Sequence, residues 1–169
     1  MHRKFRRSYF SGFTLIEILV VIGMIAILAS VVLIAINPVR QFAQARNSQR
    51  VSNVNAILNA IGNRMAENRG IFTDSNTCTT ALPTTATLMG SASGAFDIRP
   101  CLVPTFISEL PVDPVSGKNT CSSASCSGTE SYATGYSIKQ EATTGRITVC
   151  APGYAEPSLN ETVPYCLTR

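Results

Sequence analysis

An apolar stretch near the amino terminus limits what this chain can fold into. Residues 18–36 form nineteen positions that are all apolar except for Gly23 and Ser30. At about 1.5 Å of rise per residue, a helix of this length measures about 28 Å, close to the thickness of the hydrocarbon core of a bilayer. We therefore predict a helix that crosses a membrane once.

Cationic residues flank this stretch unevenly. Arg3, Lys4, Arg6 and Arg7 are crowded together before it, whereas the arginines that follow it are widely spaced. Cations close to a membrane span tend to stay on the cytoplasmic side, so we expect a cytoplasmic amino terminus and an outer carboxy-terminal part. No small-x-small pattern follows the stretch, so we do not expect cleavage there as in a secretory signal.

One carboxylate, Glu17, lies at the start of the apolar stretch. At the bilayer centre a carboxylate costs about 2.5–3.5 kcal/mol, and the cost is smaller near the interface. One interpretation is an interfacial acid that favours the positive amino-terminal end of the helix. The other is an acid with a dedicated partner.

The residues around Glu17 resemble the amino terminus of the type IV prepilin family, which includes type IV pilins and the pseudopilins of type II secretion and DNA-uptake machines. The resemblance rests on the basic leader, Gly12, the sequence Phe13-Thr14-Leu15-Ile16-Glu17 and the apolar stretch. It implies that a prepilin peptidase cuts after Gly12 and that the new amine of Phe13 is methylated. It further implies that Glu17 pairs with the Phe13 amine of a neighbouring subunit, where each charge offsets part of the other's desolvation cost.

The net charge depends on whether the leader is counted. The 169 residues include 14 Lys and Arg and 10 Asp and Glu, and four of these cations lie in residues 1–12. The remaining chain is neutral, which argues against a broad nucleic-acid-binding surface. Its charge is uneven, because residues 13–69 hold five Arg and two Glu, whereas residues 70–169 hold five cations and eight acids.

Six cysteines lie beyond the apolar stretch, which suits disulfides in an oxidising compartment. Fifteen complete pairings are possible, and we favour sequential pairing because short loops are the easiest to close. The favoured pairs are Cys78 with Cys101, Cys121 with Cys126, and Cys150 with Cys166. A metal site is the alternative, but there is no C-x-x-C pair and the only histidine is His2. We predict no metal and no cofactor.

A second helical pattern follows Pro38, where we expect the first helix to kink or restart, or simply to end. Apolar residues recur at spacings of three and four along an amphipathic helix that stops near Arg69-Gly70. These residues are Val51, Val54, Leu58, Ile61 and Met65. We expect this stripe to pack on a head domain, with Arg50 on another face and residues 39–50 available for contacts between subunits.

Later segments predict a small sheet. Alternating apolar residues on both sides of the turn 143–145 indicate a β-hairpin within residues 136–149, and a further strand is expected at 163–167. Residues 73–94 suggest a long loop with a short helix, and residues 104–110 another short helix. The expected fold is α+β, with a long helix packed on a small antiparallel sheet, which is also what the family resemblance implies.

The predicted organisation has four parts. Residues 1–12 form a cleaved leader, 13–36 the transmembrane and assembly half of the long helix, 37–69 its amphipathic half, and 70–169 a disulfide-stabilised head.

A proline-bounded loop near the middle of the head offers a candidate for calcium, which some pseudopilin heads bind. Its oxygen-bearing residues are Asp113, Ser116 and Asn119, with Gly117 between them. A calcium loop needs several converging oxygens, and only one firm carboxylate is present. We therefore favour an ordinary turn.

No catalytic constellation is evident, because the chain after the leader has no histidine and no glycine-rich phosphate loop. We predict a non-enzymatic subunit of a type IV pilus-like helical filament, a homo-oligomer that forms in an extracellular pilus or a periplasmic pseudopilus. The resemblance implies a prepilin peptidase, an inner-membrane assembly platform and an assembly ATPase as partners. The alternatives are a pseudopilin of type II secretion or DNA uptake, and a membrane-anchored binding head that does not polymerise.

Overall fold

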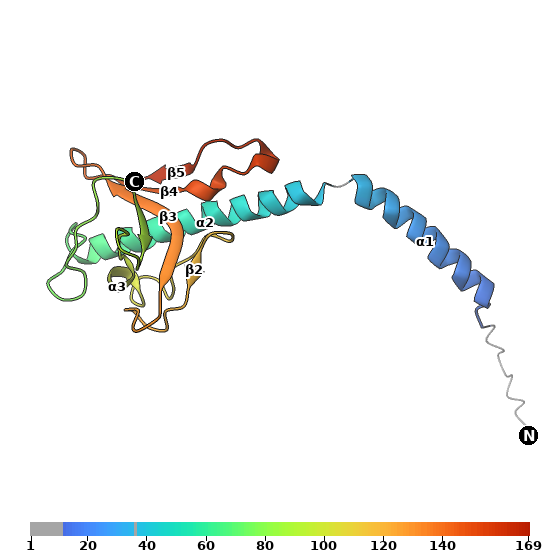
Figure 1. Ribbon diagram of the computed structural model, residues 1–169, viewed down its shortest axis with the longest axis horizontal. Coiled ribbons are helices and arrows are strands. Elements are labelled where there is room, and N and C mark those ends of the chain that lie inside the picture. Colours follow the sequence, from blue (N-terminus) through green and yellow to red (C-terminus); the bar gives the residue numbers. More distant parts are fainter. Residues whose placement is uncertain (1–11, 36) are drawn as a thin grey trace, which may run out of the picture. The chain divides into compact units, whose positions relative to one another are not determined.

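The computed structural model describes residues 12–35 and 37–169. The chain divides into two compact units, Met1–Pro38 and Val39–Arg169. The described part of the first unit contains helix α1, and the second unit contains the sheet and the remaining helices (Figure 1).

Helix α1 (Leu15–Ala35) covers most of the apolar stretch. Its 21 residues correspond to about 32 Å of helix. The helix ends three residues before Pro38, whose ring would clash with the carbonyl of the preceding turn if the helix continued. Within the described residues this is the one helix that is long and apolar enough to cross a membrane.

Helix α2 (Pro38–Glu67) begins at the proline itself, so a helix restarts there. Proline is tolerated in the first turn because the N–H that it lacks has no acceptor within the helix. The helix ends close to the predicted stop, where Arg69 and Gly70 have φ angles of 57° and 90°. The Gly70 N–H donates to the Met65 carbonyl oxygen at 2.7 Å, which satisfies one of the terminal carbonyl groups.

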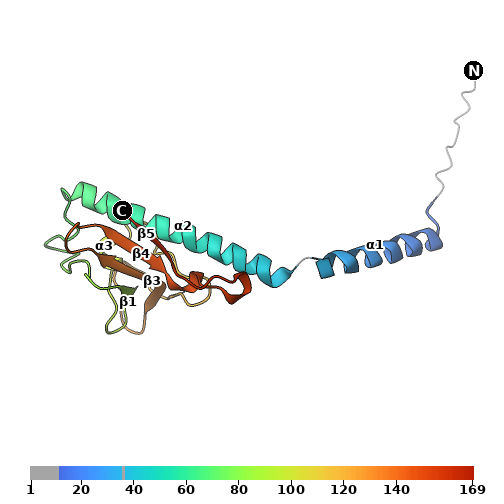
Figure 2. The same ribbon diagram turned by 90° about the horizontal axis from the view of Figure 1, so that it is seen from above.

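Among the described residues, five strands form one antiparallel sheet that packs against α2 (Figure 2). The strands are β1 (Thr87–Gly90), β2 (Lys118–Asn119), β3 (Tyr132–Gln140), β4 (Ile147–Ala151) and β5 (Tyr165–Thr168). Their order is β1-β3-β4-β5, and β2 pairs with β3. The predicted hairpin corresponds to β3 and β4, and the predicted last strand to β5. The α+β fold class is therefore confirmed.

The hydrophobic core lies between α2 and the sheet. Val54, Ile57 and Ile61 of α2 are fully buried, and Tyr136 and Val149 point inward from the sheet. The predicted stripe on α2 is correct in its centre, and its outer members are only half-buried. Burial of this apolar surface is the main force that holds α2 on the sheet.

Two expectations about local structure are wrong. Residues 104–110 form turns, and the short helix α3 (Arg99–Leu102) lies just before them. The chain turns back after α3 so that Glu109 can pair with Arg99, and a continued helix would prevent this. Residues 73–94 contain strand β1 in place of a helix, because β3 offers a partner for this segment.

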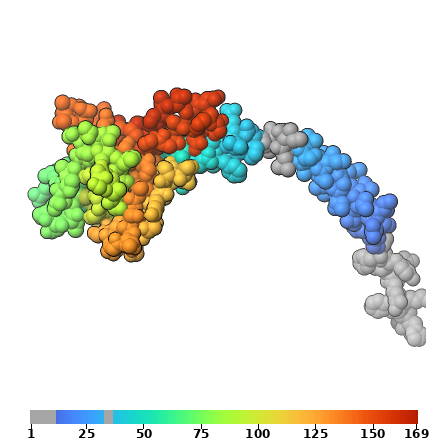
Figure 3. Space-filling view, viewed as in Figure 1, coloured from blue at the N-terminus to red at the C-terminus, as the bar shows by residue number. Residues whose placement is uncertain are grey.

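Three disulfides close the described part of the second unit: Cys78–Cys101, Cys121–Cys126 and Cys150–Cys166. These are the sequential pairs that the sequence favoured. Two 3-10 helices, η1 (Pro152–Tyr154) and η2 (Pro157–Leu159), lie between β4 and β5. In Figure 3 this carboxy-terminal segment, coloured red, lies along the amino-terminal part of α2, coloured cyan.

Candidate processing and assembly site

Helix α1 begins at Leu15, two residues after Phe13. The Glu17 N–H donates to the Thr14 hydroxyl oxygen at 3.2 Å, and the Ile18 N–H donates to the Thr14 carbonyl oxygen at 3.3 Å. Thr14 therefore caps the helix, and the spacing Thr14 to Glu17 is that of a capping box. Gly12 and Phe13 lie outside the helix, so the peptide bond between them is not part of its hydrogen-bond ladder.

The Gly12–Phe13 junction is exposed. The Phe13 side chain is 79% exposed, and a Cβ atom added to Gly12 would meet no atom within 4 Å among the described residues. An enzyme that acts on this bond can therefore approach it without unfolding any of the described structure.

Glu17 is the single charged residue on α1. Its side chain is exposed, and no described residue donates a hydrogen bond to its carboxylate. Only the threonine half of the capping box is thus made, and the carboxylate is left available for another partner.

The apolar side chains of α1 are exposed over residues 15–32, including Leu15, Ile22 and Leu28. Exposed apolar surface costs about 25 cal/mol per Å² in water, so this helix needs lipid or other helices around it. The one hydroxyl, that of Ser30, donates to the Ile27 carbonyl oxygen at 2.7 Å and needs no further partner.

A cluster of charged residues fixes α2 to the sheet-bearing part of the second unit. Arg50 is only 2% exposed and donates from Nε to Asp113 Oδ2 at 2.5 Å. It also donates to Glu156 Oε1 at 2.7 Å. Arg46 donates to both carboxylate oxygens of Glu156, at 2.8 and 3.0 Å. We call Arg46, Arg50, Asp113 and Glu156 the charged clasp.

The clasp changes the titration of both of its acids. Burial opposes ionisation of Asp113, but hydrogen bonds from Arg50 and from the Ser116 and Val115 N–H groups outweigh it and hold the pKa at about 2. Hydrogen bonds from Arg46 and Arg50 hold the pKa of Glu156 at about 2 as well. The Asp113 oxygens thus face donors, and among the described residues no group of acids, histidines and cysteines is arranged to hold a metal ion.

Sequence reasoning missed the clasp. The sequence pattern predicts Arg50 on a face other than the apolar stripe, but it does not predict that this side chain is buried. The sequence does contain a helical spacing that includes Arg50, because Ala43, Asn47, Arg50 and Val54 follow one another at intervals of four, three and four residues. All four are buried in the structure. Part of the segment expected to contact other subunits, residues 39–50, is therefore covered by the chain itself.

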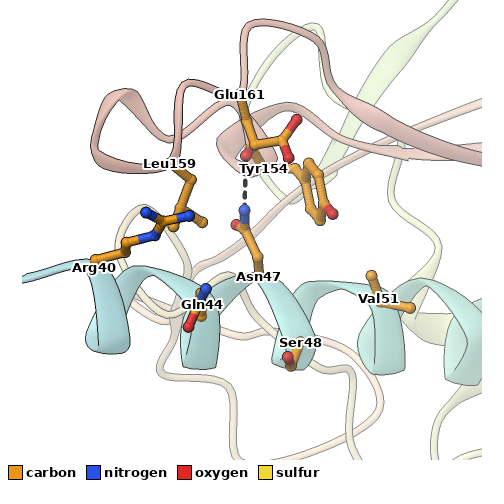
Figure 4. Close-up of a pocket in the computed structure, with 8 residues that line it drawn as sticks. All are labelled: Arg40, Gln44, Asn47, Ser48, Val51, Tyr154, Leu159 and Glu161. Atoms are coloured by element: carbon orange, nitrogen blue, oxygen red, sulfur yellow. Dashed lines mark hydrogen bonds between the residues drawn. The ribbon is translucent and has the colours of Figure 1, made fainter.

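A hollow of about 470 Å³ lies beside the clasp, between α2 and the segment that carries η1 and η2 (Figure 4). Its lining residues are Arg40, Gln44, Asn47, Ser48, Val51, Tyr154, Leu159 and Glu161. The Asn47 side-chain amide donates to the Tyr154 carbonyl oxygen at 3.0 Å and ties the two walls together. The residues that line the hollow include no histidine or cysteine, so they offer no such base or nucleophile for catalysis.

The clasp predicts a loss of stability in acid. The pKa values of Asp113 and Glu156 are about 2 when folded, below their ordinary values of about 3.9 and 4.3. Both acids therefore stabilise the fold above about pH 4.5, and this contribution is lost as the pH falls towards 2. Urea unfolding of the detergent-solubilised chain across this range measures the effect.

Glu156→Gln should flatten this pH dependence, because one of the two depressed pKa values is removed. Glu141→Gln is the matched control, since Glu141 lies exposed in the turn between β3 and β4. Equal pH slopes in the parent chain and in Glu156→Gln would contradict the prediction.

Comparison with known proteins bears on the junction and on α1. Residues 7–33 match the family model described as the prokaryotic N-terminal methylation motif, and this match includes Gly12, Phe13 and Glu17. No curated protein and no solved structure matches the chain. The methylation motif and the apolar helix that follows it support a type IV prepilin-like protein, a precursor of the pilin or pseudopilin type.

Proposed function

We propose that the chain is a structural subunit of a type IV pilus-like filament. The observation that carries this proposal is the surface of α1, which is apolar and exposed over residues 15–32 and carries one carboxylate in its first turn. A bilayer covers such a helix in the precursor, and the α1 helices of neighbouring copies cover it in a filament.

Cleavage after Gly12 supplies the missing charge. While residues 1–12 remain attached, the Phe13 nitrogen is a neutral amide; once they are removed it becomes an amine, which stays cationic after methylation. This amine pairs with the Glu17 carboxylate of a neighbouring copy. In an apolar bundle either charge alone carries a large desolvation cost, so the pair sets the register between copies.

The precursor in this proposal crosses the membrane once, with its amino terminus in the cytoplasm. Prepilin peptidase removes the leader, and an assembly platform with its ATPase draws the mature chain into an extracellular pilus or a periplasmic pseudopilus. The second unit is displayed along the filament, and we propose no catalytic role for it.

Amino-terminal sequencing and mass measurement of the mature protein test the proposal. We expect the first residue to be Phe13 and, after reduction of the three disulfides, the mass to exceed that of residues 13–169 by one CH2, the net gain when a methyl group replaces an amine hydrogen. Gly12→Val should block cleavage. The described fold has space for a larger side chain at this position, so the substitution should act on recognition by the peptidase and leave the fold unchanged. Mature protein that begins at another residue would overturn the proposal.

Deletion of the gene distinguishes the two kinds of filament. Loss of surface filaments supports a pilus subunit, whereas intact surface filaments with a loss of protein export support a pseudopilus subunit.

A further inference from the structure

Two buried arginines outside the processing site hold the backbone of disulfide-bonded cysteines. Arg64, on the last turns of α2, is only 4% exposed. Its guanidinium donates to the Cys101 carbonyl oxygen at 2.6 Å and to the Phe72 carbonyl oxygen at 2.6 Å. It lies over the rings of Phe72 and Phe106, with its central carbon 5.5 and 5.7 Å from their centroids. This packing fixes the plane of the guanidinium and the directions of its donors.

The same arginine reaches the other cysteine of this pair through Asp74. Arg64 donates to Asp74 Oδ2 at 2.5 Å. Asp74 Oδ1 accepts the Cys78 N–H at 3.0 Å, and the Asp74 N–H donates to the Cys78 carbonyl oxygen at 2.8 Å. Arg64 and Asp74 thus hold the main chain on both sides of the Cys78–Cys101 disulfide. The bond from the Cys78 N–H and the one from Arg64 lower the pKa of Asp74 well below its usual range, so this acceptor stays charged.

Arg99 repeats the arrangement at the second disulfide. It is 1% exposed and donates to the Ser123 carbonyl oxygen at 2.7 Å and to the Cys121 carbonyl oxygen at 3.3 Å. A two-point contact with Glu109 holds the guanidinium in place. The loop between Cys121 and Cys126 is therefore bound through its backbone as well as through its sulfur atoms.

The third disulfide is positioned differently. Cys150 and Cys166 are direct register partners on the adjacent strands β4 and β5. Strand pairing alone brings these two cysteines together. Cys78 and Cys101 are 23 residues apart and are not register partners on paired strands among the described residues. The contacts from Arg64 hold their main chains together instead.

We infer that Arg64 is a positioning residue for oxidation of the chain, which brings Cys78 and Cys101 together before their bond forms. In this step the two thiols react with a small disulfide such as oxidised glutathione. The protein gains one S–S bond and loses two protons and two electrons, and the oxidant is reduced to two thiols. Arg64 takes no part in the electron transfer and acts only by selecting this pair among the fifteen possible pairings.

The contacts of Arg64 and the Cys78–Cys101 bond are coupled reciprocally. If the arginine contacts favour the bonded state of the cysteines by a given factor, the bond favours the arginine contacts by the same factor. The inference does not depend on filament assembly, so it is tested on the chain before or after processing.

The test measures the Cys78–Cys101 equilibrium with glutathione. The full chain in detergent is reduced, equilibrated with mixtures of oxidised and reduced glutathione, trapped with acid, and mapped by mass spectrometry without reduction. In Arg64→Met, which keeps an apolar stem but no donors, we expect the equilibrium constant for this bond to fall by about tenfold or more. In Arg64→Lys the same equilibrium constant should fall by a similar factor, because one ammonium group cannot reproduce the several fixed donors of the guanidinium.

Internal and external controls accompany these variants. The Cys150–Cys166 bond should form in Arg64→Met as in the parent, and Arg146→Met, at an exposed arginine, should leave all three bonds unchanged. An unchanged Cys78–Cys101 constant in Arg64→Met would overturn the inference.

A second test removes the disulfide and observes the arginine, and it applies even if Arg64→Met does not fold. In Cys78→Ser with Cys101→Ser, the Arg64 Nε–H should still exchange slowly, with its protection lowered by no more than about the tenfold coupling factor, because the contacts precede the bond. Loss of that protected signal would show that the disulfide positions the arginine, and would overturn the inference as well.

Discussion

Glu17→Ala should abolish filament assembly while the chain still inserts in the membrane and is still cut after Gly12. The carboxylate is the single charge on α1, and no described residue binds it within its own chain. Without it, the Phe13 amine of each neighbouring copy enters an apolar bundle unpaired. Membrane insertion should improve slightly, because a carboxylate costs about 2.5–3.5 kcal/mol at the bilayer centre and less than this near the interface, where the start of α1 lies. Electron microscopy and quantification of sheared filaments measure the loss.

The design separates charge from size. Glu17→Gln preserves the shape without the charge and should fail like Glu17→Ala, whereas Glu17→Asp preserves the charge and should retain some filaments. Ser30→Ala is the matched control on the same helix, since the Ser30 hydroxyl is satisfied by the Ile27 carbonyl. Filaments of normal number and length in Glu17→Ala would refute the pairing. A parent chain that never assembles would instead indicate a membrane-anchored binding head.

Arg50→Met should lower the free energy of unfolding of the chain by about 3–5 kcal/mol, the range for breaking a buried ion pair by removing one partner. Arg50 and Asp113 have side chains that are only 2% and 1% exposed. The substitution leaves the Asp113 carboxylate buried with only the hydrogen bonds from Val115 and Ser116. Urea unfolding followed by circular dichroism measures the change.

A second substitution distinguishes an uncompensated charge from lost packing. Arg50→Met combined with Asp113→Asn should recover part of the loss, because no buried carboxylate remains without its cation. The control Arg146→Met, at an exposed arginine, should change the free energy by less than about 0.5 kcal/mol. A similarly small change for Arg50→Met would show that the clasp contributes little.

The parts that the sequence predicted are those that depend on residues close together in the chain. The apolar stretch, the alternation around the turn at 143–145 and the stop at Gly70 each lie within about twenty residues. The residues of the proposed processing and assembly site, Gly12, Phe13 and Glu17, also lie within one short motif, and the match to the methylation motif covers them. The cap at Thr14 is also local, because the spacing from Thr14 to Glu17 is that of a capping box.

The parts that were not predicted depend on partners far apart in the chain. Arg50 and Asp113 are 63 residues apart in the chain, and no local sequence pattern predicts that they pair. A charged residue in an amphipathic helix is normally solvated, so its burial becomes evident only once the opposing loop is placed. The same holds for β1, whose segment resembles a polar loop until β3 provides a partner strand.

The two arginine anchors on α2 have a mechanical consequence. Arg50 and Arg64 are fourteen residues apart, about 21 Å along the helix, and each is bound to a different part of the second unit. A pull along the helix axis therefore loads both anchors at once, in shear, and the helix cannot peel away one turn at a time. Tension applied through the amino-terminal end of α2 is carried at one anchor by the Asp113 loop and at the other by the segment that the Cys78–Cys101 bond closes.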